Sequence, residues 1–280
     1  MLPSGKRPPT RMKKGTEMKR QIIAFAFAAA AVFSSQVSAS AADLELLQPG
    51  KLLVATEGTF PPFSMRAADG TLDGLEIRVM KEISKRLGLE YTPVIIKWES
   101  LLIGLQADQY DITSDALDIT PERQKQVVFA DGWLESGGVV VVPNNSSIKS
   151  PDDLKGKTVG ALASSTFSKI AEDKGAAVKG YKAETDGIQD LINGNIDAEI
   201  TDAIGAGYMI KSANMPLQVL PEFVSRIQKG FAVKKGKPEL VKAVNKALAD
   251  MIADGTYAKL TTDLVGFNPA PKDPIKSILQ

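Results

Sequence analysis

Short apolar runs alternate with helical patterns from Gly50 onward, and this alternation constrains the fold more than any other feature of the sequence. Residues 52–56 and 91–96 are predicted strands. Residues 76–87 are a predicted helix, because their apolar side chains fall on one face and Gly88 follows as a stop signal. Alternating strands and helices are typical of βαβ units, so we expect an α/β fold with mostly parallel sheets.

A second series follows an apolar run at residues 139–143, whose Pro-Asn-Asn-Ser-Ser end suits a crossover between two lobes. A strand near residues 229–233 and an apolar helical stripe at 239–254 are predicted to return the chain to the first lobe. We therefore expect two α/β lobes joined by two crossing strands, with a cleft at the carboxyl ends of the strands. The other predicted elements are strands at 158–162 and 198–201 and helices at 100–106, 167–174, 188–193 and 203–211.

The N-terminus has the layout of a secretory signal peptide. Met18-Lys19-Arg20 leads into an apolar run at residues 22–33, and small residues follow it. The run is about a dozen residues, short of the roughly 20 that span a bilayer, so we expect cleavage after Ala39 or Ala41 and a periplasmic protein. The predicted division is 1–41 for an upstream extension and signal peptide, 42–139 for the first part of lobe 1, 140–228 for lobe 2, and 229–280 for the return to lobe 1 and the C-terminal tail.

Charge and composition exclude several classes of function. Residues 1–41 hold seven of the 34 basic and one of the 33 acidic residues, which leaves 27 basic against 32 acidic residues and a net charge of −5. Nothing in that balance favours nucleic-acid phosphates. The chain has no cysteine and no histidine, which removes thiolate nucleophiles, histidine-based triads and the usual zinc ligands. We expect a binding role with no metal and no cofactor.

A lone arginine follows a helix-opening corner at Thr120-Pro121-Glu122-Arg123. Free N–H groups at such a corner and a planar guanidinium together suit one small carboxylate. On spacing alone, a solvated arginine on a charged helix face is the competing interpretation.

Several segments, in order, resemble the periplasmic solute-binding proteins that serve polar amino-acid ABC transporters. The resemblance implies a two-lobed Venus-flytrap fold, an amino-acid-like ligand, a membrane permease as partner, a monomer and no catalysis. Met18 is then the more natural initiator. The segments that carry the resemblance are residues 56–64, 98–105, 118–131, 135–141, 152–160 and 194–202.

The resemblance implies which residues bind the ligand. Arg123 matches the arginine that grips the α-carboxylate, and Asp202 matches the carboxylate that receives the α-ammonium from the opposite lobe. Asp202 also suits a helix N-cap, and both roles are compatible. Phe60 and Trp98 match rings on either side of the ligand side chain, with core packing as the alternative. Glu57 falls where an acidic residue meets the far end of a basic ligand.

Two stretches depart from the family's pattern. Ser165 and Thr166 keep the hydroxyls that complete the carboxylate site, or they form a simple N-cap cluster, while Ser164 replaces a glycine. Asp115-Ala116-Leu117-Asp118 stands where relatives have Ser-Gly-Met-Thr or a close variant. Asp118 replaces a donating hydroxyl, and a carboxylate there would repel the ligand's carboxylate unless Arg123 or an added ligand cation lies between them.

The predicted site residues carry more negative than positive charge. The set is Glu57, Phe60, Trp98, Asp115, Ala116, Asp118, Arg123, Ser165, Thr166 and Asp202. Four carboxylates against one arginine favour a ligand with extra positive charge, such as a basic amino acid.

The expected function is therefore the exported ligand-binding component of an amino-acid ABC importer. The alternative is a cyclohexadienyl-dehydratase-like enzyme on the same scaffold, with Asp115 or Asp118 as acid or base. A ligand-sensing module is a third possibility.

Overall fold

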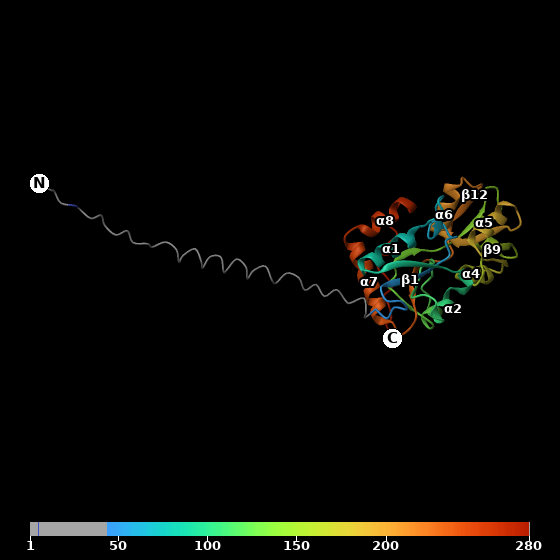
Figure 1. Ribbon diagram of the computed structural model, residues 1–280. Coiled ribbons are helices and arrows are strands. Elements are labelled where there is room, and N and C mark those ends of the chain that lie inside the picture. Colours follow the sequence, from blue (N-terminus) through green and yellow to red (C-terminus); the bar gives the residue numbers. More distant parts are fainter. Residues whose placement is uncertain (1–4, 6–43, 280) are drawn as a thin grey trace. The chain divides into compact units, whose positions relative to one another are not determined.

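The structure, a computed structural model, describes residue 5 and residues 44–279 (Figure 1). Apart from Gly5, the predicted upstream extension and signal peptide lie outside the described residues. Residues 44–279 contain two five-stranded sheets with helices packed against them. No helix in this part of the chain is both long and apolar enough to cross a membrane.

The first lobe is built on a sheet with the strand order β4-β1-β5-β14-β6. Strand β1 pairs in parallel with β4 and β5, whereas β14 pairs antiparallel with β5 and β6. The elements are β1 (Lys51–Thr56), β2 (Met65–Arg66), β3 (Leu72–Asp73), α1 (Leu75–Arg86), β4 (Glu90–Ile95), the 3-10 turn η2 (Trp98–Ser100), α2 (Leu101–Gln106), β5 (Ile112–Thr113), α3 (Pro121–Gln124), β6 (Val128–Phe129), β14 (Ala232–Val233), α7 (Pro238–Ala253) and α8 (Thr256–Val265).

Two helices far apart in sequence close the core of this lobe. Helix α1 buries Val79, Met80 and Ile83 on one face, and α7 contributes Val244 and Leu248 to the same cluster. Apolar residues three and four apart share a helix face, so both stripes were readable from the sequence. The return of the chain to its first lobe through α7 therefore follows from burial of both stripes in one core.

The second lobe repeats the plan with the strand order β10-β9-β11-β8-β12. Strands β10, β9 and β11 are parallel, and β8 runs antiparallel to β11 and β12. The elements are β8 (Gly138–Pro143), the 3-10 turn η3 (Pro151–Leu154), β9 (Thr158–Leu162), α4 (Thr166–Asp173), β10 (Ala177–Tyr181), α5 (Glu184–Ile192), β11 (Ala198–Asp202), α6 (Ala203–Ser212) and β12 (Leu217–Phe223). The predicted two-lobed α/β fold is confirmed.

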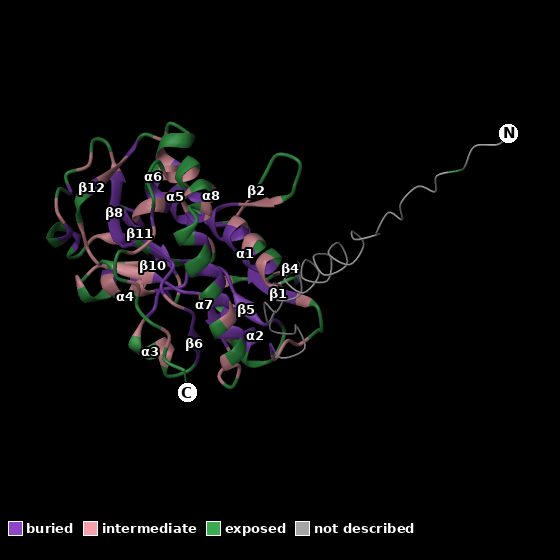
Figure 2. Cartoon of the chain, turned by 90° about the vertical axis from the view of Figure 1, so that its left-hand side faces the viewer, coloured by how far each residue is buried: buried purple, intermediate pink, exposed green. Residues whose placement is uncertain are grey.

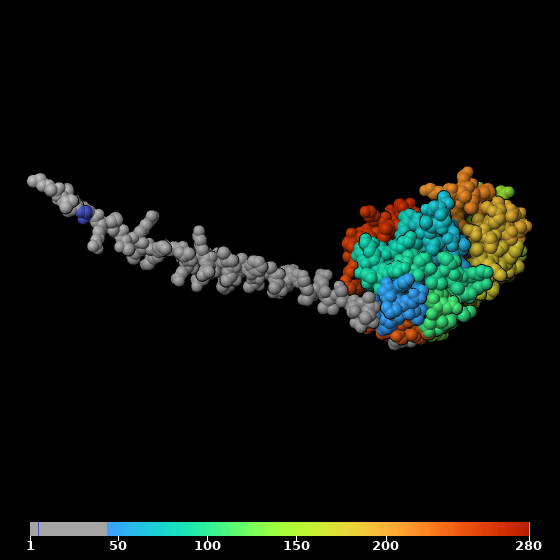
Figure 3. Space-filling model, in the orientation of Figure 1, coloured from blue at the N-terminus to red at the C-terminus, as the bar shows by residue number. Residues whose placement is uncertain are grey.

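Two antiparallel strands, β7 (Leu134–Ser136) and β13 (Ile227–Lys229), carry the chain between the lobes. Figure 3 shows the yellow and orange atoms of the second lobe beside the cyan, green and red atoms of the first. The run at 139–143, predicted to cross between the lobes, instead forms most of β8 inside the second sheet. A valine run that is buried on both faces suits a central strand. The strand predicted at 229–233 is divided between β13 and β14.

Figure 2 shows that central strands of both lobes, such as β1 and β8, are buried. The interior also holds an unusual set of charged side chains, each less than 5 % exposed. Burying a charged group costs free energy unless it is paired or neutralised, so these residues require partners. They are Glu76, Asp111, Asp115, Asp118, Glu184, Glu199, Asp202 and Lys229.

Candidate functional site

A closed pocket of about 20 Å³ lies between the two lobes. That volume holds about one water molecule, so an amino acid enters only when the lobes separate. Nine of the ten predicted ligand-binding residues line the pocket, and Asp202 lies just outside its lining. The first lobe contributes Glu57, Phe60, Trp98, Asp115, Ala116, Asp118 and Arg123, the second contributes Leu162, Ser165, Thr166, Phe167 and Glu184, and crossing strand β13 contributes Lys229.

Arg123 is held at the pocket by the short helix α3. The Thr120 hydroxyl caps this helix by accepting a hydrogen bond from the Arg123 backbone N–H at 3.2 Å. The guanidinium donates from Nη1 to the Asp118 carbonyl oxygen at 3.1 Å, and its Cζ lies 5.3 Å from the centre of the Trp98 ring. Burial lowers the pKa of Arg123, with partial opposition from Asp118, but arginine remains charged. Its remaining N–H groups suit a bidentate carboxylate.

The two predicted rings take different positions. Phe60 is buried against Phe63, with ring centres 4.9 Å apart. Trp98 is half-buried and donates its indole N–H to the Ala163 carbonyl of the second lobe at 3.1 Å. Its backbone N–H donates to a Glu57 oxygen at 2.6 Å. Glu57 therefore positions Trp98, while burial raises the pKa of the Glu57 carboxyl against the opposing effect of that hydrogen bond.

The hydroxyls of the second lobe meet the pocket at the start of α4. Ser165 caps this helix and accepts from the Ser168 backbone N–H at 3.2 Å. Thr166 donates its hydroxyl across the pocket to the Asp118 carboxylate. Ser165 therefore both caps helix α4 and lines the pocket, so its two predicted roles are compatible.

Two residues beside the pocket adopt backbone angles that favour glycine. Ala116 has a φ of 46° and Ser164 has a φ of 59°, and both stand where the sequence comparison expects glycine. A side chain in this left-handed region costs about 1 kcal/mol. The turns on both sides of the pocket therefore keep their shape without glycine.

Lys229 is one of four pocket residues that the sequence analysis missed, together with Leu162, Phe167 and Glu184. Its ammonium lies 2.5 Å from Asp118 Oδ1 and 3.0 Å from Asp202 Oδ2, and its side chain is 2 % exposed. Burial lowers the pKa of Lys229, but attraction to Asp118 and Asp202 outweighs it and raises the pKa above the ordinary value. A lysine directly before the run Gly230-Phe231-Ala232-Val233 was the signal in the sequence, and its partners were visible only in three dimensions.

Asp202 is surrounded by partners from the protein itself. It caps α6 by accepting from the Ile204 backbone N–H at 2.8 Å, and it accepts from the Ser136 hydroxyl at 2.7 Å. These hydrogen bonds go to Oδ1, whereas Oδ2 accepts none within the described chain and lies 3.0 Å from the Lys229 ammonium. The N-cap role is observed, and contact between Asp202 and a ligand ammonium remains a prediction.

These contacts change the expected charge of the site. The sequence analysis expected Arg123 or a ligand cation to separate Asp118 from the ligand's carboxylate. The structure instead places Lys229 between Asp118 and Asp202, so this part of the surplus negative charge is offset within the chain. The remaining surplus lies at Glu57, Asp115 and Glu184. Within the described chain, no lysine or arginine forms an ion pair with any of these three.

Burial shifts the titration of the remaining acids. It raises the pKa of Asp115 well above its ordinary value, with repulsion from Glu57 and Glu76 acting in the same direction. Burial likewise raises the pKa of Glu184 to about 7. Glu199 lies beside Glu184, and burial followed by repulsion from Glu184 raises its pKa well above the ordinary value. These groups hold protons more readily than ordinary carboxyls.

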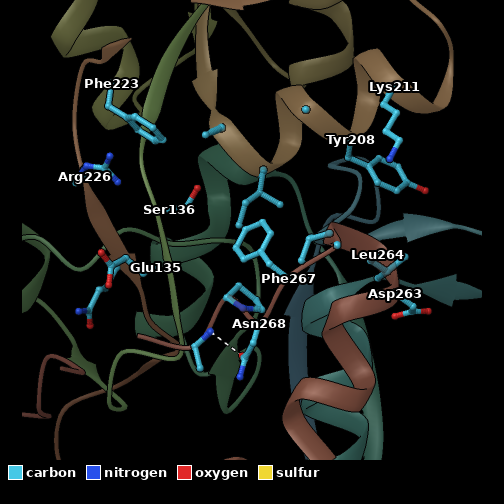
Figure 4. A pocket seen from close by; sticks show the side chains of 18 of the residues that line it. Glu135, Ser136, Tyr208, Lys211, Phe223, Arg226, Asp263, Leu264, Phe267 and Asn268 are labelled. Carbon is cyan, nitrogen blue, oxygen red and sulfur yellow. Dashed lines mark hydrogen bonds between the residues drawn. The ribbon is translucent and has the colours of Figure 1, made fainter. Parts of the chain in front are cut away.

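Figure 4 shows a second, wider groove of about 1140 Å³. It is lined by crossing-strand residues such as Glu135, by Tyr208 and Lys211 of α6, and by the segment that contains Phe267. None of the ten predicted ligand-binding residues lines this groove. The candidate ligand site is therefore the interlobe pocket.

Comparisons with known proteins agree with the two-lobed fold. Residues 52–266 match the bacterial extracellular solute-binding proteins, family 3. The L-cystine-binding protein TcyJ of Escherichia coli is 36 % identical over 221 residues, which cover 78 % of this chain and 83 % of that protein.

Two solved structures are similar in fold and sequence. An ancestral arginine-binding protein bound to glutamine has a TM-score of 0.75 and 37 % identity, over 78 % of this chain and 99 % of that one. An ancestral amino-acid-binding protein described as a precursor of cyclohexadienyl dehydratase has a TM-score of 0.73 and 32 % identity, over 77 % and 96 % of the two chains. The chain therefore belongs to the bacterial extracellular solute-binding proteins of family 3.

Proposed function

We propose that this protein is the exported binding component of an amino-acid ABC importer. It acts as a periplasmic monomer after loss of a signal peptide, holds a polar amino acid or related compound between its lobes, and delivers it to a membrane permease. The observation that carries the proposal is a pocket whose walls come from both lobes around a half-buried arginine. A ligand that contacts both walls favours the closed state, because only that state makes both sets of contacts.

The proposed ligand has a carboxylate and a positively charged far end. Arg123 supplies a planar fork for the carboxylate, and Phe60 and Trp98 supply apolar surface for the stem. Glu57, Asp115 and Glu184 supply the acidic groups that suit a cation. The similar proteins support an amino-acid-like ligand, because they are described as binding cystine, arginine or glutamine.

Calorimetry on residues 42–280 tests this function. The panel is arginine, lysine, ornithine, histidine, glutamine, glutamate and cystine, together with relatives of the basic members that lack the α-amino group. Because truncation of one partner of a buried charge pair costs about 2–5 kcal/mol, Arg123→Ala should weaken binding at least about 30-fold. The matched control is Arg226→Ala, which removes an arginine that lies over Phe223 in the wide groove. Unchanged binding by the Arg123 variant refutes the proposal, and binding of glutamate alone refutes the cationic ligand.

The enzyme alternative keeps one supporting observation. Asp115 and Glu184 are buried pocket acids whose pKa values are raised, which suits general acid catalysis. A cyclohexadienyl substrate that is turned over by the wild-type protein, with loss of turnover in Asp115→Asn, would establish it. Tight binding of a panel compound without turnover favours the transport function.

A further inference from the structure

Lys229 is the cation that pairs with the carboxylate that would otherwise receive a ligand ammonium. Its ammonium bridges Asp118 of the first lobe and Asp202 of the second at 2.5 and 3.0 Å. The Ser136 hydroxyl and the Ile204 N–H both donate to Oδ1 of Asp202. Oδ2 of Asp202 accepts no hydrogen bond within the described chain, but it faces the Lys229 ammonium, so the charge of this carboxylate is already offset.

A second ammonium at this place is also opposed by charge. All three side chains of the bridge are at most 5 % exposed, so water screens little of the repulsion between two cations. The Thr166 hydroxyl donates to the other Asp118 oxygen and occupies the remaining side of that carboxylate. A ligand α-ammonium would therefore be repelled by Lys229, because Asp118 and Asp202 are already paired with that lysine.

The rest of the pocket keeps its binding capacity. Arg123 uses one N–H for the Asp118 carbonyl, so the guanidinium still offers donors to a carboxylate. Glu184 is 3 % exposed and Asp115 is 4 % exposed, and both line the pocket without a basic partner among the described residues. A cation at the far end of a ligand would supply that partner.

We propose that the ligand is a small carboxylate with a cationic group at its far end and no ammonium beside the carboxylate, and that Lys229 selects against the α-ammonium. The chemical class is that of ω-amino and ω-guanidino acids. The inference rests on the proposed function and narrows its ligand class. Lys229 acts as a specificity-determining residue, because it takes the place of the ligand's own α-ammonium.

Two matched pairs of compounds isolate the α-ammonium. Lysine and 6-aminohexanoate differ only in that group, as do arginine and 5-guanidinopentanoate. Calorimetry on the wild-type protein should show at least about tenfold tighter binding of the compound without the α-ammonium in at least one pair. Equal binding, or tighter binding of lysine and arginine, overturns the inference.

Lys229→Met keeps an unbranched side chain, one atom shorter than that of lysine, and removes the charge. It should raise the affinity for lysine or arginine at least about tenfold and reverse the wild-type preference, because Asp118 and Asp202 then need an external cation. Lys234→Met is the control, because Lys234 pairs with Asp108 and neither residue lines the pocket. This variant should keep the wild-type preference for the compound without the α-ammonium. A folded Lys229→Met protein with the wild-type preference overturns the role of Lys229.

The wild-type comparison decides the ligand class even if Lys229→Met does not fold. Binding of another panel compound that depends on Arg123, with none of the four matched compounds bound, overturns this inference and leaves the proposed function intact. If no compound binds in an Arg123-dependent manner, the proposed function fails together with the inference.

Discussion

Two buried acidic clusters beside the pocket differ in how the free-energy cost of burying a carboxylate is offset. Asp118 and Asp202 share the ammonium of Lys229, whereas Glu184 and Glu199 lie together without a basic partner in the described chain. Asp202 and Glu199 are both fully buried and belong to the same strand, β11. Burial alone therefore does not decide how a carboxyl group behaves here, and the presence of a neighbouring cation does.

The difference has a consequence for function. In the cluster around Lys229, one ammonium connects Asp118 in the first lobe to Asp202 in the second. Glu184 and Glu199 instead favour the protonated form, because burial opposes the ionisation of both and repulsion from Glu184 further opposes that of Glu199. The Asp118–Asp202 cluster has its counter-ion, Lys229, within the protein. The Glu184–Glu199 cluster can be neutralised by a bound cation or by a proton.

The largest expected effect comes from removing the cation of the first cluster. Lys229→Met leaves two buried carboxylates without a counter-ion, which should lower the free energy of unfolding by about 3–5 kcal/mol. Urea denaturation near neutral pH measures this change. Lys246→Met is the control, because its exposed pair with Asp250 should contribute less than about 1 kcal/mol. A loss below about 1 kcal/mol for Lys229→Met would mean that the two clusters do not differ as described.

The second prediction concerns the protonated cluster. The pKa of Glu184 is raised from 4.5 to about 7, so the folded state holds the proton and stability falls as the pH rises through this range. The contribution of Glu184 should fall by about 2–3 kcal/mol between about pH 5 and about pH 8. Glu184→Gln should remove that part of the pH dependence.

Urea denaturation at both pH values compares wild type with Glu184→Gln. The exposed Glu222→Gln variant is the control and should keep the wild-type slope. A Glu184→Gln protein that loses stability with pH as steeply as the wild type would contradict a protonated Glu184.

The smallest expected effect tests how closely the second cluster is packed. A Cβ at Gly187 of α5 would lie 2.5 Å from one oxygen of Glu199 and 2.6 Å from the other. Gly187→Ala should therefore displace this carboxyl and cost about 1–3 kcal/mol in the free energy of unfolding.

Gly207→Ala is the matched control for Gly187→Ala. Gly207 lies in α6, where a Cβ meets no atom within 4 Å, so alanine should be neutral or stabilise by about 0.5–1 kcal/mol. Thermal denaturation measures both variants. Equal effects at the two glycines would mean that Glu199 is free to move.

The sequence by itself determined the elements whose pattern is local. Apolar stripes predicted α1 and α7, and Thr120 with Pro121 predicted the short helix that holds Arg123. It did not predict α8, although Tyr257, Leu260 and Leu264 recur at helical spacing, or the edge strand β10, most of whose residues are exposed. Helix and strand periods arise from neighbouring residues, so they can be read along the chain.

Only the tertiary structure decided the charge of the site. Lys229 lies 111 positions from Asp118, and no local pattern connects them. Whether Glu184 faces water or the pocket is equally invisible to spacing along the helix. Coulomb attraction and the cost of burial depend on distance in space and on the surrounding dielectric, and these are set when the two lobes and the crossing strands come together.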